Sequence, residues 1–446
     1  MEKRKILIIS SISPYKSANL GMDIISSLQD EGYEVDFLTQ YKIPSKNVIS
    51  IQEDTEPEVV LLSSISSSKQ VSPFKRFKNK IKNYFHCKKK QKDESNQFVI
   101  INLDEVHPPI NADLITSKIT KTYDFAIILF WQGMLTTYSI KKIYNKIKRP
   151  LFIMAVDMFP FTGGCFYFWN CRRFINSSCG KCPGLNSQVE NDATRQNFLY
   201  KQQVYKNIQC LFLGNKWMKS FIEQTPIISD KPIRELPLVI NENLFKVRNR
   251  ESVAKDFNIE IKDDLFIIFA GAPSLNEKRK GFLYLVQAIK LFTQTLPRHK
   301  RSKVRLLVAG NTFEDIESYF NIKVYKLGFL NYEMLAKAYS LANVYLSSSI
   351  EDAGPSMVNQ AIMSGTPVVA FNIGVAQEIV ITGKTGYQAK VRDAKDFAKG
   401  IHFVYSLSRE ERNIIQQNCR ELGITEFSYK AFAYKIKQYD KEFCHD

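Results

Sequence analysis

The order of the first three segments constrains the fold of this chain most. The chain opens with a short apolar run, which is followed by a stretch with helical periodicity and by a second apolar run. Residues 5–10 are typical of a buried strand, and residues 20–28 place apolar side chains at helical spacing. Residues 35–39 then have the character of a second strand. A strand, a crossover helix and a parallel strand form the β-α-β unit of a doubly wound sheet. We therefore expect an α/β fold built on parallel sheets.

The second half of the chain repeats this order. A strand at 266–270, a helix at 281–292 and a strand at 304–309 are followed by further strand patterns at 325–327, 344–347 and 367–371. In the first half, further strands are expected at 59–62, 98–102, 126–130 and 151–156. Apolar periodicity lapses near 240–255. We predict an N-terminal domain over 1–245, a C-terminal domain over 246–428, and a C-terminal helix within 429–446 that returns to the first domain.

The charge of the chain indicates an anionic partner. The 446 residues carry a net charge of +17, and residues 69–92 hold ten Lys or Arg and no acid. Within the basic segment 72–90, Phe74, Phe77, Ile81 and Phe85 share one helical face, which suits an anionic membrane surface. The alternative is a solvated insertion between two strands. Nucleic acid is not favoured, because no aromatic platform or nucleic-acid motif accompanies the charge.

Nothing in the chain is typical of a membrane span or a signal peptide. The longest purely apolar stretch, 125–131, is far shorter than the ~20 residues that cross a bilayer. The N-terminal basic residues run directly into a short strand pattern with no cleavage site close behind. These features predict a cytoplasmic protein.

Four of the eight cysteines fall close together, at Cys165, Cys171, Cys179 and Cys182. In a cytoplasmic protein, clustered cysteines favour a metal or reduced thiols over disulfides. Four thiolates could surround a structural zinc ion, although only the last pair has the usual two-residue gap. A loop of reduced thiols explains the same residues, so both interpretations stay open. A catalytic metal is disfavoured.

The stretch 344–371 is typical of a ligand site at the edge of a parallel sheet. A strand at 344–347 leads into a loop that holds Asp352 and Gly354, and a helix begins near Ser356. Helix N-termini at such edges bind phosphate, and glycine allows close approach of the backbone. Gln360 lies one turn into the helix on the face of Ser356, where it could reach a ribose hydroxyl. The alternative is an ordinary loop carboxylate and an ordinary helix residue.

A second helix start in the same domain also suits phosphate. Arg279 and Lys280 precede Gly281 after the strand at 266–270. Cations beside a helix N-terminus complement phosphate oxygens. By itself, such a pair is more often only solvated. Two helix starts in one domain that could each bind phosphate favour a single phosphate-bearing ligand shared by both.

These motifs together resemble the retaining sugar-nucleotide glycosyltransferases of glycosyltransferase family 4, which have the GT-B fold. The resemblance is carried by "RKGFLYLVQAI", by "LGFLNYEMLAKAYSLANVYLSSS" and most specifically by "EDAGPSMVNQAIMSGTPVVAF". In the first half, "VDMFPFTGGCFYFWNCRRFINSSCGKCPGL" is similar to a cysteine-bearing loop, here 157–186, of a polysaccharide-making subset. The resemblance implies two Rossmann-like domains that face a central cleft.

The resemblance also implies roles for individual residues. Lys280 would neutralise the donor diphosphate, and Asp352 would approach the donor sugar, so these two are the candidate catalytic residues. Arg279 would assist Lys280, and Gln360 would bind the ribose. The other candidate donor residues are Gly354, Pro355 and Ser356 for sugar and phosphate, Gly328, Phe329 and Leu330 for the base, and Gly21, whose loop would close over the diphosphate. Trp131 and Asp157 would lie on the acceptor side.

Several positions depart from the family pattern. The family usually has glutamate where this chain has Asp352 and Gln360, and Ala272 stands where a phosphate-binding arginine is expected. Phe130 and Val156 replace two histidines of the related subset. A retaining front-face reaction lets the departing phosphate accept the acceptor proton, so the missing histidines do not exclude activity.

The function implied is transfer of a sugar from a nucleotide sugar to a growing, lipid-linked glycan of the bacterial surface, such as capsule or O-antigen. The family needs no cofactor or metal for catalysis. The enzyme would work at the inner face of the plasma membrane. Two alternatives are a GT-B protein that binds sugar nucleotide or glycan without turnover, and another GT-B enzyme such as a sugar-nucleotide epimerase.

Overall fold

The computed structural model describes residues 3–15, 19–43, 45, 47–51, 97–101, 103–228, 230–261 and 265–444. The basic segment 72–90 and the strand expected at 59–62 lie outside these residues.

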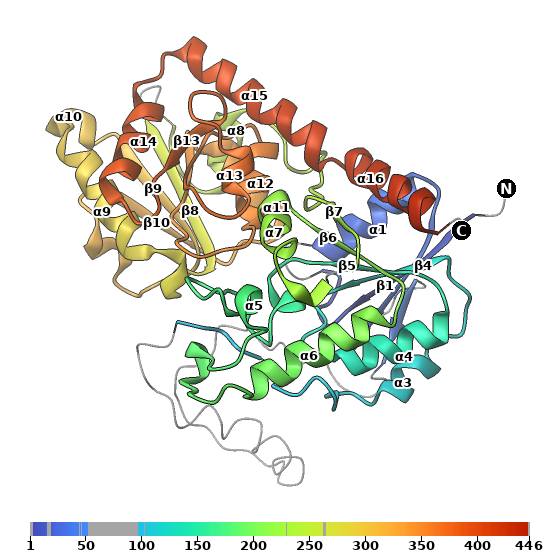
Figure 1. The fold of residues 1–446 in the computed structure, drawn as a ribbon. Helices are drawn as coiled ribbons and strands as arrows, with labels where there is room; N and C mark the ends of the chain where they lie inside the picture. Colours follow the sequence, from blue (N-terminus) through green and yellow to red (C-terminus); the bar gives the residue numbers. More distant parts are fainter. Residues whose placement is uncertain are drawn as a thin grey trace, which may run out of the picture.

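Two parallel sheets organise the described chain (Figure 1). The first has seven strands among the described residues, in the order β3-β2-β1-β4-β5-β6-β7. Their bounds are β1 Lys5–Ser10, β2 Glu34–Thr39, β3 Val48–Ser50, β4 Phe125–Leu129, β5 Leu151–Met154, β6 Cys210–Gly214 and β7 Ile233–Glu235. The order reverses between β1 and β4, where crossover connections leave in opposite directions and a crevice opens at the carboxyl ends of the strands.

The second sheet has six strands in the described chain, in the order β10-β9-β8-β11-β12-β13. Their bounds are β8 Phe266–Ser274, β9 Val304–Asn311, β10 Lys323–Gly328, β11 Val344–Ser347, β12 Val368–Phe371 and β13 Gly386–Ala389. Here the order reverses between β8 and β11. The strands that hold the two predicted phosphate motifs are therefore direct neighbours.

Helices cover both faces of each sheet (Figure 1). Those of the first half are α1 Leu20–Asp30, α3 Ala112–Ser117, α4 Thr137–Ile147, α5 Arg173–Asn176, α6 Ala193–Lys206 and α7 Lys216–Ile222. Those of the second half are α8 Arg250–Asp256, α9 Phe282–Gln294, α10 Arg298–Arg301, α11 Tyr332–Leu341, α12 Ser356–Met363, α13 Ala376–Ile379, α14 Ala394–Ser406, α15 Arg409–Phe427 and α16 Tyr429–Phe443. Short 3-10 turns include η1 Phe159–Phe161 and η4 Lys278–Lys280.

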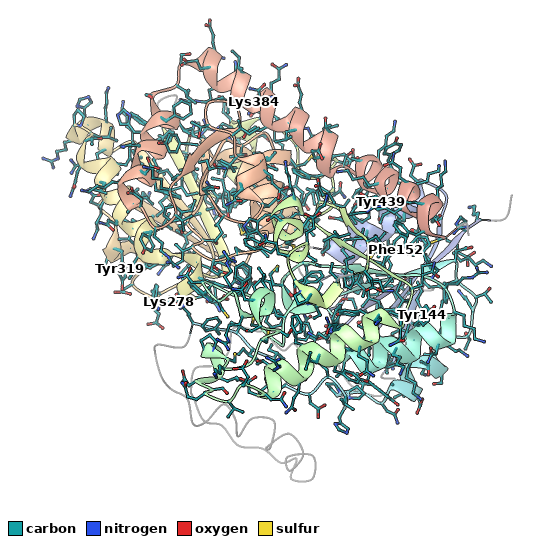
Figure 2. The ribbon with its side chains drawn as sticks, viewed as in Figure 1. Tyr144, Phe152, Lys278, Tyr319, Lys384 and Tyr439 are labelled. Carbon is teal, nitrogen blue, oxygen red and sulfur yellow. The ribbon has the colours of Figure 1, made fainter. Side chains whose placement is uncertain are left out.

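The strands are almost wholly apolar because helices cover both of their faces. In β1, Ile6 and Ile8 pack on the side of α1, whereas Leu7 and Ile9 pack on the opposite side. Phe152 of β5, labelled in Figure 2, stacks on Phe125 with ring centroids 4.6 Å apart. Such burial on two faces holds the carboxyl ends of the strands in fixed positions.

The last helix, α16, lies beside α1 of the first domain (Figure 1). Phe432, Ala433 and Ile436 are buried there with Leu28. Arg4 pairs with Asp440, so the two ends of the described chain are close. The chain thus crosses between the sheets twice, once before α8 and once through α15.

Two local expectations need correction. No strand spans 98–101: among the described residues of that segment, only Ile100 forms an isolated bridge, to Cys165. That segment runs along the cysteine-bearing loop instead of joining the sheet. The helix expected from Gly281 begins one residue later, because Gly281 has a left-handed φ of 65°. Among the described residues, no helix has both the length and the apolarity to span a membrane.

Candidate active site

A cavity of about 780 Å³ lies between the carboxyl edges of the two sheets. Phe130 and Val156, which follow β4 and β5, line its first-domain side. Gly271, Gly310 and Ser348, at the ends of the central strands of the second sheet, line the other side. The cavity therefore lies at the switch points of the sheets, where α/β folds bind ligands.

Two cations converge on one carboxylate in this cavity. Lys280 Nζ lies 2.6 Å from Asp352 Oδ2, and Arg279 Nη1 lies 2.9 Å from the same oxygen. The backbone N–H of Gly354 donates to Asp352 Oδ1 over 3.4 Å. Arg279 Nε also donates to Glu277 over 2.7 Å. Lys280 and Asp352 are 8% and 5% exposed, so these pairs are largely shielded from water.

Burial and charge act against each other in this group. Burial raises the pKa of Asp352, but Lys280 and Arg279 outweigh burial and hold the pKa of the carboxyl below its usual value. Burial lowers the pKa of Lys280, opposed by Asp352. Asp352 is therefore ionised at neutral pH. It forms ion pairs with the same two cations that an anionic ligand would bind.

Local hydrogen bonds place the cations. η4 packs against the loop after β11, where Ile350 N–H donates to the Arg279 carbonyl over 2.7 Å. Ser348 Oγ donates to the Lys280 carbonyl over 2.8 Å. The segment with both cations and the loop with Asp352 are thereby joined by one backbone and one side-chain hydrogen bond.

The start of α12 forms the floor of the cavity. Gly354, Pro355 and Ser356 line it, and no side chain caps the helix. Gln360 is fully buried and also lines the cavity; its Oε1 accepts a hydrogen bond from Tyr339 Oη over 3.2 Å. Gln360 Nε2 has no partner within the described chain. A buried amide without a partner is costly, so this N–H group is suited to a ligand oxygen.

The structure brings most of the predicted donor residues together. The residues from that set that line the cavity are Arg279, Lys280, Phe329, Leu330, Asp352, Gly354, Pro355, Ser356 and Gln360. Gly21 and Gly328 do not line it. Gly21 lies in the first turn of α1, where its neighbours Asn19 and Leu20 face the cavity.

The two predicted acceptor residues do not line the cavity. Trp131 is 1% exposed and packs edge-on against Phe159 in the first-domain core. Asp157 accepts a hydrogen bond from the Phe159 N–H over 2.8 Å, and burial raises its pKa to about 7. Their neighbours Phe130 and Val156 face the cavity instead. Successive residues near a strand end point to opposite sides, so each predicted residue is the neighbour of one that faces the cavity. An acceptor role for Trp131 and Asp157 stays a prediction.

The four clustered cysteines line a smaller cavity near Gly163 and Gly180. None of the four forms a disulfide in the described chain. Burial raises the pKa of Cys165 to about 12. In the portion of the chain that the structure describes, no three His, Cys, Asp or Glu side chains are placed to hold a metal ion. Structural zinc stays a prediction, which elemental analysis of the purified protein would test.

The sequence did not single out several cavity residues. Tyr167 reaches the cavity from the cysteine-bearing loop, and Tyr332 and Tyr345 reach it from the second domain. Ser347, Ser348 and Ser349 also line it. The polar run after the β11 pattern was an available signal for the serines, whereas the tyrosines depend on which side of each element faces inward.

Comparison with known proteins bears on the fold and on the family. Residues 253–422 match the family described as "Glycosyl transferases group 1". A glycosyltransferase from Rickettsia africae superposes with a TM-score of 0.64 at 15% identity, covering all of both chains. Anabaena HepE in complex with UDP and glucose superposes with a TM-score of 0.58 at 13% identity, covering 98% of this chain and 100% of that one. The fold is GT-B. The expectation of two Rossmann-like domains facing a cleft is confirmed.

Curated relatives of this GT-B chain are also glycosyltransferases. An uncharacterized glycosyltransferase of Methanocaldococcus jannaschii is 25% identical over 244 residues, which cover 52% of this chain and 58% of that protein. Lipopolysaccharide 1,2-N-acetylglucosaminetransferase of Salmonella typhimurium is 21% identical over 255 residues, covering 54% and 64%. The match therefore spans about three-fifths of the length of these relatives.

Proposed function

We propose that this protein is a retaining glycosyltransferase that moves a sugar from a nucleotide-sugar donor to a lipid-linked glycan of the bacterial surface. The convergence of Lys280 and Arg279 at the start of α12 carries the proposal. This arrangement places two cations and uncapped helix N–H groups around one position in the cavity. A nucleoside diphosphate has the charge and shape that such a position takes.

In the proposed reaction, the bond between the anomeric carbon and the diphosphate oxygen breaks as the acceptor oxygen attacks the same face. The acceptor proton passes to the departing phosphate oxygen. Lys280 and Arg279 stabilise the negative charge that develops on the diphosphate. Asp352 would exchange one of its cation contacts for a sugar hydroxyl. The cavity walls from both domains would exclude water and orient the acceptor.

A second candidate is a protein that binds the nucleotide sugar without turnover. Asp352 pairs with both cations in this structure, and Gln360 offers an amide where a carboxylate is usual in the resembling family. Both features fit binding as well as transfer. Turnover that depends on Lys280 separates the two candidates.

The test is nucleotide release from a panel of UDP- and GDP-sugars, with a bacterial lipid extract as acceptor. Lys280→Ala should abolish release. Lys278→Ala is the matched control, because Lys278 lies on the same 3-10 turn but is exposed at the outer edge of the domain (Figure 2). Release that survives Lys280→Ala would contradict the proposed site. Saturable binding of one donor without release would favour the second candidate.

We also propose that the basic segment 72–90 contacts anionic lipid, since a lipid-linked acceptor lies at the membrane. Deletion of residues 72–92 should reduce cosedimentation with vesicles that contain anionic phospholipid. Unchanged cosedimentation would contradict this proposal while leaving the transferase site unaffected.

A further inference from the structure

Residues 166–169, here called the strap, pack alternately on the two domains. Phe166 and Phe168 belong to the core of the first domain. Tyr167 and Trp169 pack with the core of the second domain. Successive side chains of an extended segment point to opposite sides, so one short segment fills positions in both cores. The strap therefore makes a direct mechanical connection across the cleft.

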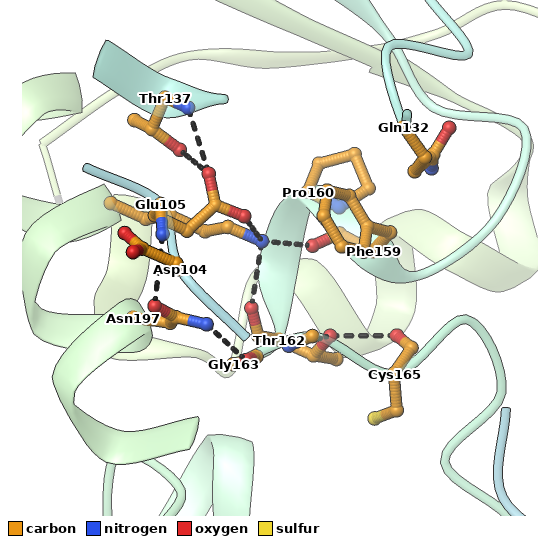
Figure 3. Close-up of polar contacts among 12 residues, drawn as sticks. Asp104, Glu105, Gln132, Thr137, Phe159, Pro160, Thr162, Gly163, Cys165 and Asn197 are labelled. Carbon is orange, nitrogen blue, oxygen red and sulfur yellow. Dashed lines mark hydrogen bonds and ion pairs between the residues drawn. The ribbon is translucent and has the colours of Figure 1, made fainter. Parts of the chain in front are cut away.

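The loop before the strap is held by a buried ion pair (Figure 3). Lys201 Nζ lies 3.4 Å from Glu105 Oε1, and both side chains are fully buried. Lys201 also donates to the carbonyls of Phe159 and Thr162, over 2.7 and 3.1 Å. Thr162 Oγ1 in turn donates to the carbonyl of Cys165 over 2.7 Å. These bonds determine where the chain enters the strap.

On its second-domain side, the strap reaches the cations of the cavity. The ring centroid of Tyr167 lies 4.5 Å from the guanidinium carbon of Arg279. Arg279 is thus held by an aromatic face as well as by Asp352 and Glu277. Tyr167 also lines the cavity. A cation over an aromatic face is stabilised more as its exposure to water falls, and the Arg279 side chain is only 15% exposed.

Trp169 attaches the strap to the loop that holds Asp352. Its backbone N–H donates to Glu351 Oε1 over 3.0 Å. Trp169 has a left-handed φ of 51°, which directs the ring into the second-domain core. The strap therefore contacts Arg279 through Tyr167, and the residue before Asp352 through Trp169.

We propose that Tyr167 is a positioning residue of the donor site, which the first domain supplies to orient Arg279 toward the donor diphosphate. This inference rests on the proposed function. It makes diphosphate affinity depend on the packing of the strap between the two domains, because that packing places Tyr167 over Arg279.

The test measures the affinity for UDP and for GDP by calorimetry in the full chain. Tyr167→Leu should weaken binding of the preferred nucleotide roughly three- to tenfold. Tyr167→Phe keeps the aromatic face and should bind as the wild type does. Phe166→Leu is the matched control, since Phe166 packs on the first-domain side of the strap. Melting temperatures identify any variant that fails to fold.

A double-mutant cycle with Arg279→Met separates positioning from general packing. If Tyr167 acts through Arg279, Tyr167→Leu should change affinity by less than about twofold once Arg279 is replaced. Full loss in both backgrounds, or wild-type affinity in Tyr167→Leu, would overturn the inference and leave the proposed function standing. Wild-type protein that binds neither UDP nor GDP would overturn both.

Discussion

Asp352 accepts hydrogen bonds from Lys280 and Arg279 through a single buried oxygen. Its charge is balanced before any ligand arrives. A donor diphosphate and Asp352 are therefore competitors for the same two cations. Buried pairs of this kind are strongly affected when one partner is removed, because the remaining charge has no compensation.

Replacing Asp352 with asparagine should tighten UDP binding by roughly tenfold or more, since the buried Lys280 would lose its carboxylate and Arg279 would keep only Glu277. The same change should lower the melting temperature and abolish sugar transfer. Calorimetry with UDP and thermal melts measure these effects. Glu277→Gln is the control, because Glu277 is exposed and its ion pair with Arg279 is screened by water. Weaker UDP binding in the Asp352 variant would contradict the competition.

At the scale of secondary-structure elements, the junction of η4 with α9 positions the two cations of the candidate site. Gly281 adopts a left-handed φ of 65°, and an added Cβ would lie 2.0 Å from the carbonyl oxygen of Ser348. Only glycine permits this approach of two backbones. The approach lets the loop after β11 bond to the turn that holds the two cations.

Gly281→Ala should lower the free energy of unfolding by roughly 2–4 kcal/mol, because left-handed strain adds to a backbone clash. It should also weaken UDP binding, since Lys280 is the preceding residue. Gly383→Ala is the matched control: Gly383 has a φ of 81° but an added Cβ would meet nothing within 4 Å. In denaturant unfolding, the control should lower the free energy of unfolding by about 1 kcal/mol, which is the cost of left-handed strain alone. Equal effects of the two substitutions would contradict the role of the close approach.

At the scale of the whole molecule, Asp23 of α1 joins the two domains. It accepts hydrogen bonds from Tyr332 of α11 and from Tyr429 of α16, the latter over 2.8 Å. Glu242 lies nearby and also accepts from the Tyr429 N–H. Burial raises the pKa of Asp23 to about 6, against the lowering effect of the two tyrosines and the backbone of Asn241.

This raised pKa predicts a pH-dependent domain junction. The folded form binds the Asp23 proton more tightly than the unfolded chain, so the stability linked to Asp23 is lost as the pH rises from about 4 to about 6. Asp23→Asn should remove that fall. The free energy of unfolding of the wild type, minus that of the variant, should fall by at most about 3 kcal/mol between pH 4 and pH 7. Denaturant titration at each pH measures it. A constant difference would contradict the prediction.

Local patterns in the sequence predict the fold class and the position of the candidate site. Strands such as Lys5–Ser10 are recognisable because burial on two faces leaves a continuous apolar run. Residues 344–371 indicate a ligand edge because a strand, a glycine-bearing loop and a helix start are adjacent in the chain. The residues predicted within this stretch, Asp352, Gly354, Pro355, Ser356 and Gln360, line the cavity because they are close together in the chain.

Which side chains face the cavity, and how the domains meet, follow from three-dimensional packing and not from local patterns. Phe130 and Val156 face the cavity in place of Trp131 and Asp157, because the direction of a side chain after a strand depends on what packs beside it. Tyr167 reaches Arg279 across 112 positions of sequence through the packing of the strap between two cores. Contacts of this kind arise from three-dimensional packing between distant segments, which local periodicity does not contain.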